Sequence, residues 1–221
     1  VAMDFDLFLL ICNYIGTIAF AVSGVVKGFK KNLDIFGITL LGILTAVGGG
    51  IIRDTMIGQI PKALTDPSSI YLSAAVALMM YLFVRTKKND NPMEKQMLLF
   101  LTTTNLVFDS IGLAVFSLIG ASAGTDLKLN AMTSGILATL TGVGGGILRD
   151  VLVNETPIVL KEDVYAVLAL GAGISYHLLV VNLNLPRVPV YLTLFVIFLL
   201  IRLAVIKYKL RLPNMTSGKA E

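Results

Sequence analysis

The sequence predicts an all-α integral membrane protein with seven transmembrane helices, the first six of which form an inverted 3+3 helix repeat. Three observations predict this fold class. The composition is too apolar for a soluble protein, seven apolar stretches approach or exceed the length of a membrane span, and one glycine-rich motif occurs twice. We expect residues 1–221 to form a single transmembrane domain.

The composition excludes a soluble enzyme, a disordered chain and a fibrous repeat. Of the 221 residues, 56% are hydrophobic and 14% are charged, and the mean hydropathy is +0.83. A soluble globule of this size could not cover its surface with so few polar residues. The single Cys12 excludes an internal disulfide and a cysteine metal cage, and the single His177 excludes a multi-histidine metal site. We therefore expect no cofactor and no resident metal.

Each predicted helix is a long apolar run, and a helix needs about 20 such residues to cross the bilayer core. The predicted spans are 5–26, 34–58, 69–85, 97–121, 130–153, 163–182 and 188–206. The third is the shortest, so its ends are the least well defined. Long continuous runs indicate helices, because the strands of a membrane barrel are short and alternate in polarity.

The placement of Lys and Arg predicts the orientation. Outside the glycine-rich motifs, thirteen of these residues fall on one side of the spans and three on the side of the N-terminus. Positive residues accumulate in cytoplasmic loops. We expect a multi-pass protein of the cell membrane with its N-terminus outside and a basic cytoplasmic tail at 207–221 that contacts membrane lipid. The net charge of +4 is explained in the same way, so nucleic acid is not an expected partner.

Two parts of the chain are related by an offset of 96 residues. Without gaps, residues 15–84 align with 111–180 and share 21 identities over 70 positions. Each copy, 5–85 and 97–182, holds three helices. Because three is odd, the second copy must enter the membrane from the opposite face. Inverted repeats are typical of transport proteins, whose solute path lies between the repeats. The seventh helix, 188–206, has no partner and is expected to serve packing or assembly.

Three consecutive glycines lie inside the second predicted helix and again inside the fifth. They are Gly48, Gly49 and Gly50, and Gly144, Gly145 and Gly146. Each glycine costs about 1 kcal/mol relative to alanine in a helix interior. We expect the helices to kink or break there and to expose carbonyl groups to a path, with potassium or sodium bound transiently. The alternative is that small residues let two helices approach closely; both can hold at once.

A charged pair follows each triplet, Arg53-Asp54 in the first copy and Arg149-Asp150 in the second. Charged groups at membrane depth are costly, so they pair with each other or face water. One interpretation is that the pairs set the electric field at each mouth of a pathway. The other is that each pair fixes its helix to a neighbour. Because the motifs are mirror-related, we expect one pair toward each membrane face.

Polar residues in the first and fourth predicted helices are further pore candidates. Asn13 aligns with Asp109 at the offset of 96, and Ser110 follows Asp109. Asp109 is the sole acid inside its helix and is therefore a functional candidate. Its alternative role is a buried partner for Arg53 or Arg149. Asn13 is expected to make a hydrogen bond between helices.

Paired Gly-Gly-Gly-x-x-Arg-Asp motifs, a duplicated three-helix unit and a seventh helix resemble the trimeric intracellular cation (TRIC) channel family, in particular its short prokaryotic members. The resemblance covers about 5–206. It implies a homotrimer with an hourglass pore in each protomer, conducting potassium and less selectively sodium, and shaped by kinks at the glycines. Related bacterial sequences have been described as glycine transporters. The animal members have a lysine-bearing pore motif and bind phosphoinositide, but the fourth helix here has no intramembrane lysine, so neither property is expected.

The leading hypothesis is thus a potassium-permeable monovalent cation channel. The alternative is a secondary transporter for glycine or a similar small solute, which needs alternating access where a channel needs only a gate. An intramembrane enzyme is not expected, because the sequence lacks the spacing of the metalloprotease, serine hydrolase and P-loop motifs.

Overall fold

The structure is a computed structural model that describes residues 4–86, 93–161 and 163–208. All regular secondary structure in these ranges is helical. The helices are α1 (Phe5–Lys30), α2 (Ile35–Met56), α3 (Lys62–Thr65), α4 (Ser68–Thr86), α5 (Met93–Asp126), α6 (Ala131–Leu152), α7 (Ile158–Lys161), α8 (Asp163–His177), the π-helical η1 (Leu178–Asn182) and α9 (Arg187–Tyr208). Most of the predicted basic tail, residues 209–221, lies outside the described residues.

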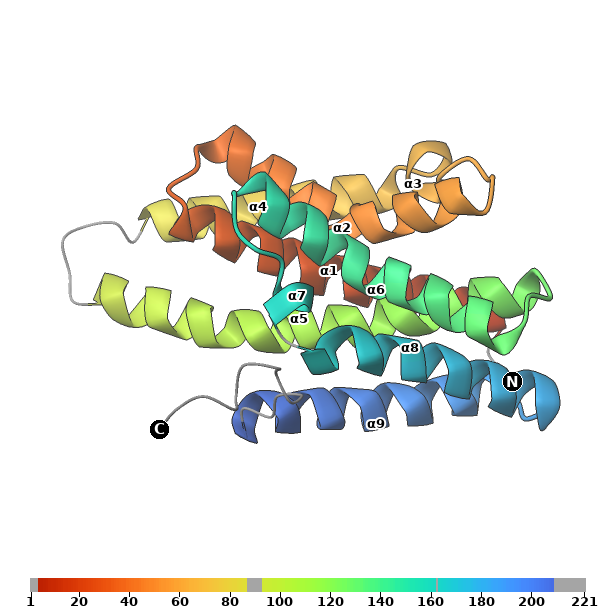
Figure 1. Ribbon diagram of the computed structural model, residues 1–221. Helices are drawn as coiled ribbons and strands as arrows, with labels where there is room; N and C mark the ends of the chain where they lie inside the picture. Colours follow the sequence, from red (N-terminus) through yellow and green to blue (C-terminus); the bar gives the residue numbers. More distant parts are fainter. Residues whose placement is uncertain (1–3, 87–92, 162, 209–221) are drawn as a thin grey trace.

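The long helices run along one common axis of the molecule (Figure 1). Among the described residues, six segments are long and apolar enough to cross a membrane. They lie in α1, α2, α5, α6, α8 with η1, and α9. The third predicted span corresponds to α4, whose apolar part, Ser68–Val84, is shorter. The protein is therefore a multi-span membrane protein, and the crossing by α4 stays a prediction.

The two halves of the chain use the same local devices at positions 96 residues apart. Asp34 caps α2 by accepting a hydrogen bond from the Gly37 backbone N–H at 2.7 Å. Asn130 caps α6 by accepting one from the Thr133 N–H at 2.9 Å. These side chains satisfy N–H groups that have no partner within the helix. Figure 1 also shows α1 and α5 running in opposite directions, which is the arrangement that an inverted repeat requires.

The links after α2 and α6 each contain one helical turn, α3 and α7. The Asp54 carboxylate accepts a hydrogen bond from the Lys62 N–H at 2.8 Å, and the Asp150 carboxylate accepts one from the Ile158 N–H at 2.9 Å. These are the first N–H groups of the two short helices, which lack intrahelical partners. The carboxylates of the motif therefore fix the start of α3 and α7.

Helices α2 and α6 continue without interruption through their glycine triplets. The predicted breaks at Gly48–Gly50 and Gly144–Gly146 are therefore wrong, and the backbone carbonyls there remain within helices. The glycine cost of about 1 kcal/mol per residue is too small to interrupt a helix that packs against neighbours. A bend without a break stays a prediction.

The triplets instead form the crossing point of α2 and α6. A Cβ atom added at Gly49 would overlap the backbone carbonyl oxygen of Thr141, and one added at Gly145 would overlap that of Thr45. These two contacts are equivalent under the offset of 96. Only a residue without a Cβ allows the backbones to approach so closely. The interpretation of the triplets as a close-approach surface is thus the one that the structure supports.

Aromatic residues join the remaining long helices around this crossing. Phe20 of α1 and Phe116 of α5, which are equivalent in the repeat, lie with ring centroids 5.1 Å apart. Tyr191 of α9 donates a hydrogen bond to the Val115 carbonyl at 2.9 Å and packs its ring edge-on against Phe8. Helix α9 is therefore bound to both halves of the chain through α1 and α5.

Candidate functional site

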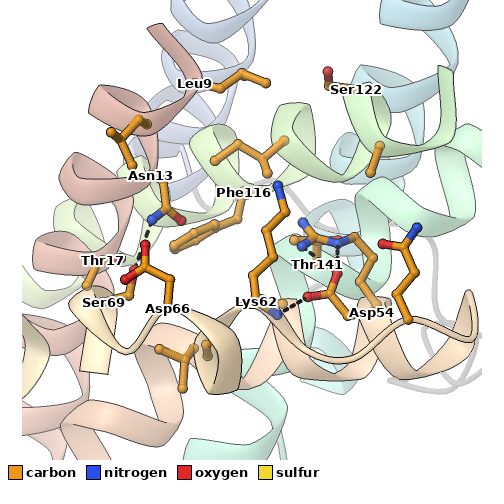
Figure 2. Close-up of a pocket in the computed structure, with 18 of the residues that line it drawn as sticks. Leu9, Asn13, Thr17, Asp54, Lys62, Asp66, Ser69, Phe116, Ser122 and Thr141 are labelled. Carbon is orange, nitrogen blue, oxygen red and sulfur yellow. Dashed lines mark hydrogen bonds and ion pairs between the residues drawn. The ribbon is translucent and has the colours of Figure 1, made fainter. Parts of the chain in front are cut away.

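A cavity of about 670 Å³ lies at the end of the bundle where α1 begins and where α2 and α5 end. Arg53 and Asp54 form part of its wall, and Asp54 is labelled in Figure 2. The Arg53 Nε donates to Asp54 Oδ1 at 2.8 Å, and its Nη2 lies 2.7 Å from the same oxygen. The exposed fraction of Arg53 is 7% and that of Asp54 is 3%. The first charged motif is therefore a buried ion pair with one side toward the cavity.

Uncharged polar groups line the wall of this cavity opposite the ion pair. Asn13 of α1 donates a hydrogen bond from Nδ2 to Ser69 Oγ of α4 at 2.9 Å (Figure 2). Thr17, one turn further along α1, is 1% exposed, and its hydroxyl has no hydrogen-bond partner among the described residues. Gly50 also lines the cavity. The predicted site residues Asn13, Gly50, Arg53 and Asp54 therefore share one water-accessible space.

The rim of the cavity is acidic. Asp6 and Asp66 are exposed there, and Asp126 lies at the rim in an ion pair with Arg187 at 2.7 Å. In total four aspartates and two basic residues, Arg53 and Lys62, line the cavity. Carboxylates around a concave mouth raise the local concentration of cations.

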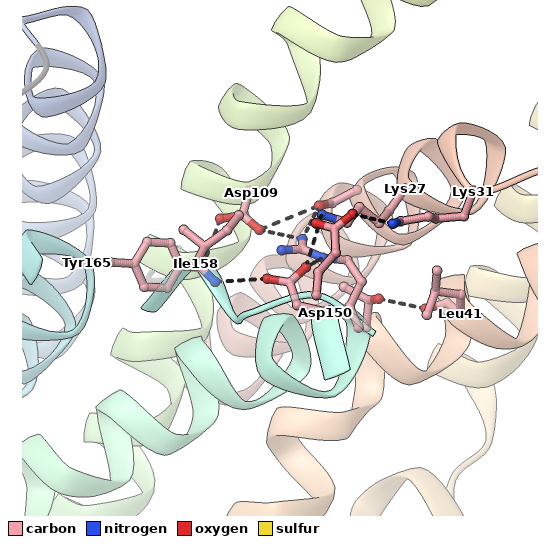
Figure 3. A network of polar contacts seen from close by, with 11 residues as sticks. Lys27, Lys31, Leu41, Asp109, Asp150, Ile158 and Tyr165 are labelled. Carbon is pink, nitrogen blue, oxygen red and sulfur yellow. Dashed lines mark hydrogen bonds and ion pairs between the residues drawn. The ribbon is translucent and has the colours of Figure 1, made fainter. Parts of the chain in front are cut away.

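The second charged motif, Arg149-Asp150, lies toward the other end of the bundle. Side chains of the protein occupy the space around it. Arg149 Nε donates to Asp150 Oδ1 at 2.9 Å, and Arg149 Nη1 lies 2.7 Å from Asp109 Oδ1 and donates to Ser23 Oγ at 2.5 Å. The Tyr165 hydroxyl donates to the second Asp109 oxygen at 2.8 Å (Figure 3). None of these five residues exceeds 2% exposure.

Two lysines and a glutamate extend this network toward the end of α1. Lys27 Nζ lies 2.6 Å from Glu155 Oε2 and 3.5 Å from Asp150 Oδ1, and Lys31 Nζ lies 2.8 Å from Glu155 Oε1. Hydrogen bonds from Lys27 and then Lys31 lower the pKa of Glu155 from its ordinary value of 4.5 to about 2. The glutamate therefore remains ionised and links the α6–α7 connection to α1.

The two charged motifs are equivalent in sequence but differ in what surrounds them. The equivalent residues, at the offset of 96, are Asn13 and Asp109, Ser69 and Tyr165, Ile119 and Ser23, and Ala123 and Lys27. The member of each pair near Arg53 is uncharged, and all four line the cavity. The member near Arg149 is a charged or hydroxyl-bearing group that contacts the network. One end of the bundle consequently holds a cavity, and the equivalent region at the other end is filled by side chains.

The structure assigns the predicted site residues to three places. The cavity is lined by Asn13, Gly50, Arg53 and Asp54. The network contains Asp109, Arg149 and Asp150. Gly146 lies beside the network, because a Cβ atom added there would be 3.7 Å from both Arg149 Nη2 and the Tyr165 hydroxyl. Gly48, Gly49, Gly144 and Gly145 lie at the helix crossing. Ser110 donates to the Leu106 carbonyl at 2.7 Å and faces Arg202 across a small separate cavity, so it does not join the other candidates.

Sequence reasoning missed Ser69, Tyr165 and Glu155 as site residues. Tyr165 lies 56 positions from Asp109, and no local pattern connects them. A signal was nevertheless present: Ser69 and Tyr165 are equivalent in the repeat, just as Asn13 and Asp109 are. Pairs that differ in polarity between otherwise similar copies mark the places where the two ends of the bundle differ.

Comparisons with known proteins agree with the duplicated architecture. The model of a family described as glycine transporter matches residues 10–86 and 106–180. The UPF0126 inner membrane protein YadS of Escherichia coli K12 is 34% identical over 203 residues, which are 91% of this chain and 93% of that protein. A UPF0126 membrane protein of Vibrio cholerae is 35% identical over 220 residues, covering 99% of this chain and 87% of the relative.

Solved structures of similar fold are described as TRIC channels, whereas the family model is described as glycine transporter. A crystal structure of a prokaryotic TRIC channel in 0.5 M KCl aligns with a TM-score of 0.81 and 34% identity, over 93% of this chain and 99% of that one. A TRIC cation channel studied for its conductance aligns with a TM-score of 0.80 and 31% identity over 100% of both chains. The chain is a TRIC-family membrane protein, and it belongs to the family that the glycine transporter model describes.

In this TRIC-family protein, both matched segments contain a glycine triplet and an Arg-Asp pair. The family likeness therefore covers the crossing, the cavity and the network together. The orthologue from Rhodobacter sphaeroides, described as a trimeric intracellular cation channel, aligns with a TM-score of 0.80 at 26% identity over 92% of this chain and 99% of that one.

Proposed function

We propose that this protein is a monovalent cation channel, permeable to potassium and less selectively to sodium, with a path inside each protomer. The observation that carries the proposal is a polar cavity with an acidic rim that reaches the glycine crossing, opposite a second mouth closed by side chains. The fold of the TRIC channels supports it further. A non-enzymatic role is part of this proposal.

The path begins at the cavity and continues toward Arg149. Aspartates at the rim attract cations, and the oxygens of Asn13, Thr17 and Ser69 replace part of their water. Because the helices remain intact at the triplets, these side-chain oxygens take the role that the sequence assigned to exposed carbonyls. The glycines contribute by bringing α2 and α6 close together. The Arg149 network acts as the closed gate.

The assembly and orientation follow the same proposal. A homotrimer is supported by the trimeric channel orthologue. The basic residues Lys27 and Lys31 lie at the gate end of α1, which favours a cytoplasmic gate and an outward-facing cavity. The N-terminus is then outside and the C-terminus cytoplasmic. Opposed α1 and α5 support an inverted repeat of 5–85 and 97–182.

Recording of potassium currents from the purified protein in planar bilayers tests the proposal. Tyr165→Phe removes a hydrogen bond to the buried Asp109 carboxylate, a kind of bond worth roughly 1.5–3 kcal/mol. If that bond exists only in the closed state, the open probability rises about tenfold or more. Tyr191→Phe is the matched control, because it also removes a buried hydroxyl but lies outside the network.

Equal open probability in both tyrosine variants would contradict the gate. Absence of unitary currents from wild type, together with saturable uptake of a small solute, would instead favour the alternative of a secondary transporter for glycine or a similar solute. The two outcomes are distinct, because channel currents appear as steps and carrier flux does not.

A further inference from the structure

The link between α2 and α3 is more positive than the equivalent link between α6 and α7. Lys62 begins α3 where Ile158 begins α7, and Gln59 stands where the second copy has Glu155. The first exchange adds a positive charge and the second removes a negative one, so the two links differ by two charges. Both Gln59 and Lys62 line the cavity, so this difference in charge acts on the cavity.

The backbones of the two links are held in the same way, whereas the side chains enter different surroundings. The Lys62 and Ile158 N–H groups both donate to the aspartate of the preceding motif. Ile158 packs against the apolar cluster that contains Tyr165. The Lys62 side chain extends from α3 into the cavity (Figure 2). The repeat therefore keeps the backbone anchor in both copies and places an ammonium group in the copy that borders the cavity.

The Lys62 ammonium group makes no ion pair or hydrogen bond within the described ranges of the chain. Both oxygens of the Asp54 carboxylate are already engaged, Oδ1 by Arg53 and Oδ2 by the Lys62 backbone N–H. Of the two basic residues that line the cavity, Arg53 is thus paired with a carboxylate and Lys62 is not. An unpaired charge in a concave space changes the electrostatic potential that an entering ion meets.

We propose that the Lys62 ammonium group makes the cavity select monovalent over divalent cations. This inference rests on the proposed channel and assigns one residue to its selectivity. The energy of an ion near a fixed charge is proportional to the charge of the ion, so Lys62 repels a divalent cation twice as strongly as a monovalent one. By the same rule, the exposed Asp6 and Asp66 at the rim favour divalent cations. Lys62 offsets that preference at the cavity, while the rim still attracts cations.

The expected size of the effect follows from Coulomb's law. At about 7 Å in water, two unit charges of the same sign repel each other by about RT, which changes the occupancy of a monovalent cation about 2.7-fold. The factor for a divalent cation is the square of this value, about sevenfold. Removing the Lys62 charge should therefore raise the occupancy of divalent relative to monovalent cations about threefold.

Reversal potentials of the purified protein in planar bilayers, with potassium on one side and calcium on the other, measure this ratio. Lys62→Gln should raise the permeability of calcium relative to potassium about threefold, whereas Lys62→Arg keeps the charge and should retain the wild-type ratio. Lys128→Gln is the matched control and should also retain it. This variant removes the same charge from an exposed residue at the same end of the bundle, outside the lining of the cavity.

Charged thiol reagents measure the same potential without any ion flux. In a Cys12→Ser, Ser69→Cys protein, the new thiol lies at a position that lines the cavity. Its rates of reaction with a cationic and an anionic reagent of similar size are compared. Because the reagents differ by two charges, Lys62→Gln should raise the ratio of the cationic to the anionic rate about sevenfold. Lys128→Gln should leave this ratio unchanged.

An unchanged reagent ratio in Lys62→Gln, or an equal rise in Lys128→Gln, would overturn the role of Lys62 whether or not the protein conducts. In a conducting protein, a calcium permeability that does not rise in Lys62→Gln would overturn it as well. A raised reagent ratio without unitary currents from wild type would instead refute the proposed channel and leave the electrostatic barrier at Lys62 standing.

Discussion

Asp109 and Asn13 occupy equivalent positions in the two copies of the repeat, and only Asp109 can carry a charge. The Asp109 carboxylate accepts hydrogen bonds from both Arg149 and Tyr165, which brings α5, α6 and α8 together at one point. The Asn13 amide carries no charge and contacts only Ser69 by hydrogen bond among the described residues. The buried carboxylate thus joins three helices at one end of the bundle, whereas its amide equivalent lies in the wall of the cavity at the other end.

Glu155 provides a residue-scale prediction with a defined pH dependence. Its pKa is lowered from 4.5 to about 2, so its contacts with Lys27 and Lys31 contribute fully to stability above about pH 4.5 and are lost as the pH falls toward 2. Across this window, the Tm of wild type should fall more steeply than that of Glu155→Gln, which cannot titrate. Thermal unfolding of both proteins in nanodiscs measures this difference. Parallel curves would show that the Glu155 contacts do not stabilise the fold.

At the scale of elements, the crossing of α2 and α6 is set by backbone contact rather than by interlocking side chains. Thr45 and Thr141, one turn before each triplet, turn their hydroxyls back onto the Leu41 and Leu137 carbonyls at 2.6 Å. Their own carbonyls then face the glycines of the opposite helix. The crossing therefore holds the two repeats at a fixed separation between the cavity and the network.

The glycines of one triplet should differ sharply in their tolerance of alanine. Gly49→Ala places a Cβ against the Thr141 carbonyl, and such overpacking costs about 1–3 kcal/mol. Gly50→Ala meets its nearest atom, Arg53 Nη2, at 4.0 Å, so it should gain about 1 kcal/mol of helix propensity. Denaturation of each variant in mild detergent gives both values. Similar stability of the two variants would contradict the crossing described above.

At the scale of the whole molecule, the chain is a nearly symmetric duplication with an asymmetric interior. The bounds of α2 and α6, their N-caps and the short connecting helices α3 and α7 repeat at the offset of 96 residues. The cavity, in contrast, occurs at one end, and the equivalent volume at the other holds Lys27, Ser23 and Tyr165. A path with two mouths that is closed at one of them would show this asymmetry.

Cysteine accessibility tests this one-sidedness. In a Cys12→Ser background, Ser69→Cys should react with a charged thiol reagent only from the face at which α1 begins, because Ser69 lines the cavity. Ser73→Cys, one turn along α4 and 0% exposed, is the matched control and should not react. Ser23→Cys should be protected from both faces. Reaction of Ser23→Cys from the opposite face would show that the second mouth is open in the membrane.

The sequence predicted the helices well and the site in part. Five of the seven predicted ranges agree with the bounds of a helix to within a few residues, whereas α5 extends beyond 97–121 at both ends and 163–182 is divided between α8 and η1. The sequence did not decide whether Arg53 or Arg149 is the partner of Asp109, because hydrophobic periodicity carries no information on which helices touch. The glycines were expected to kink or break their helices, because helix propensity is a local property; the packing that keeps these helices continuous is not local.

The sequence by itself determined that the chain is a duplicated, helical membrane protein, because hydropathy, charge placement and repeat are properties of the order of residues. The tertiary structure alone decided that Asp109 and Tyr165 close over Arg149 while Arg53 faces a cavity. Those contacts join helices far apart in the chain, and their distances depend on how closely α2 and α6 approach. Small side chains allow that approach, and the packing of the whole bundle fixes it.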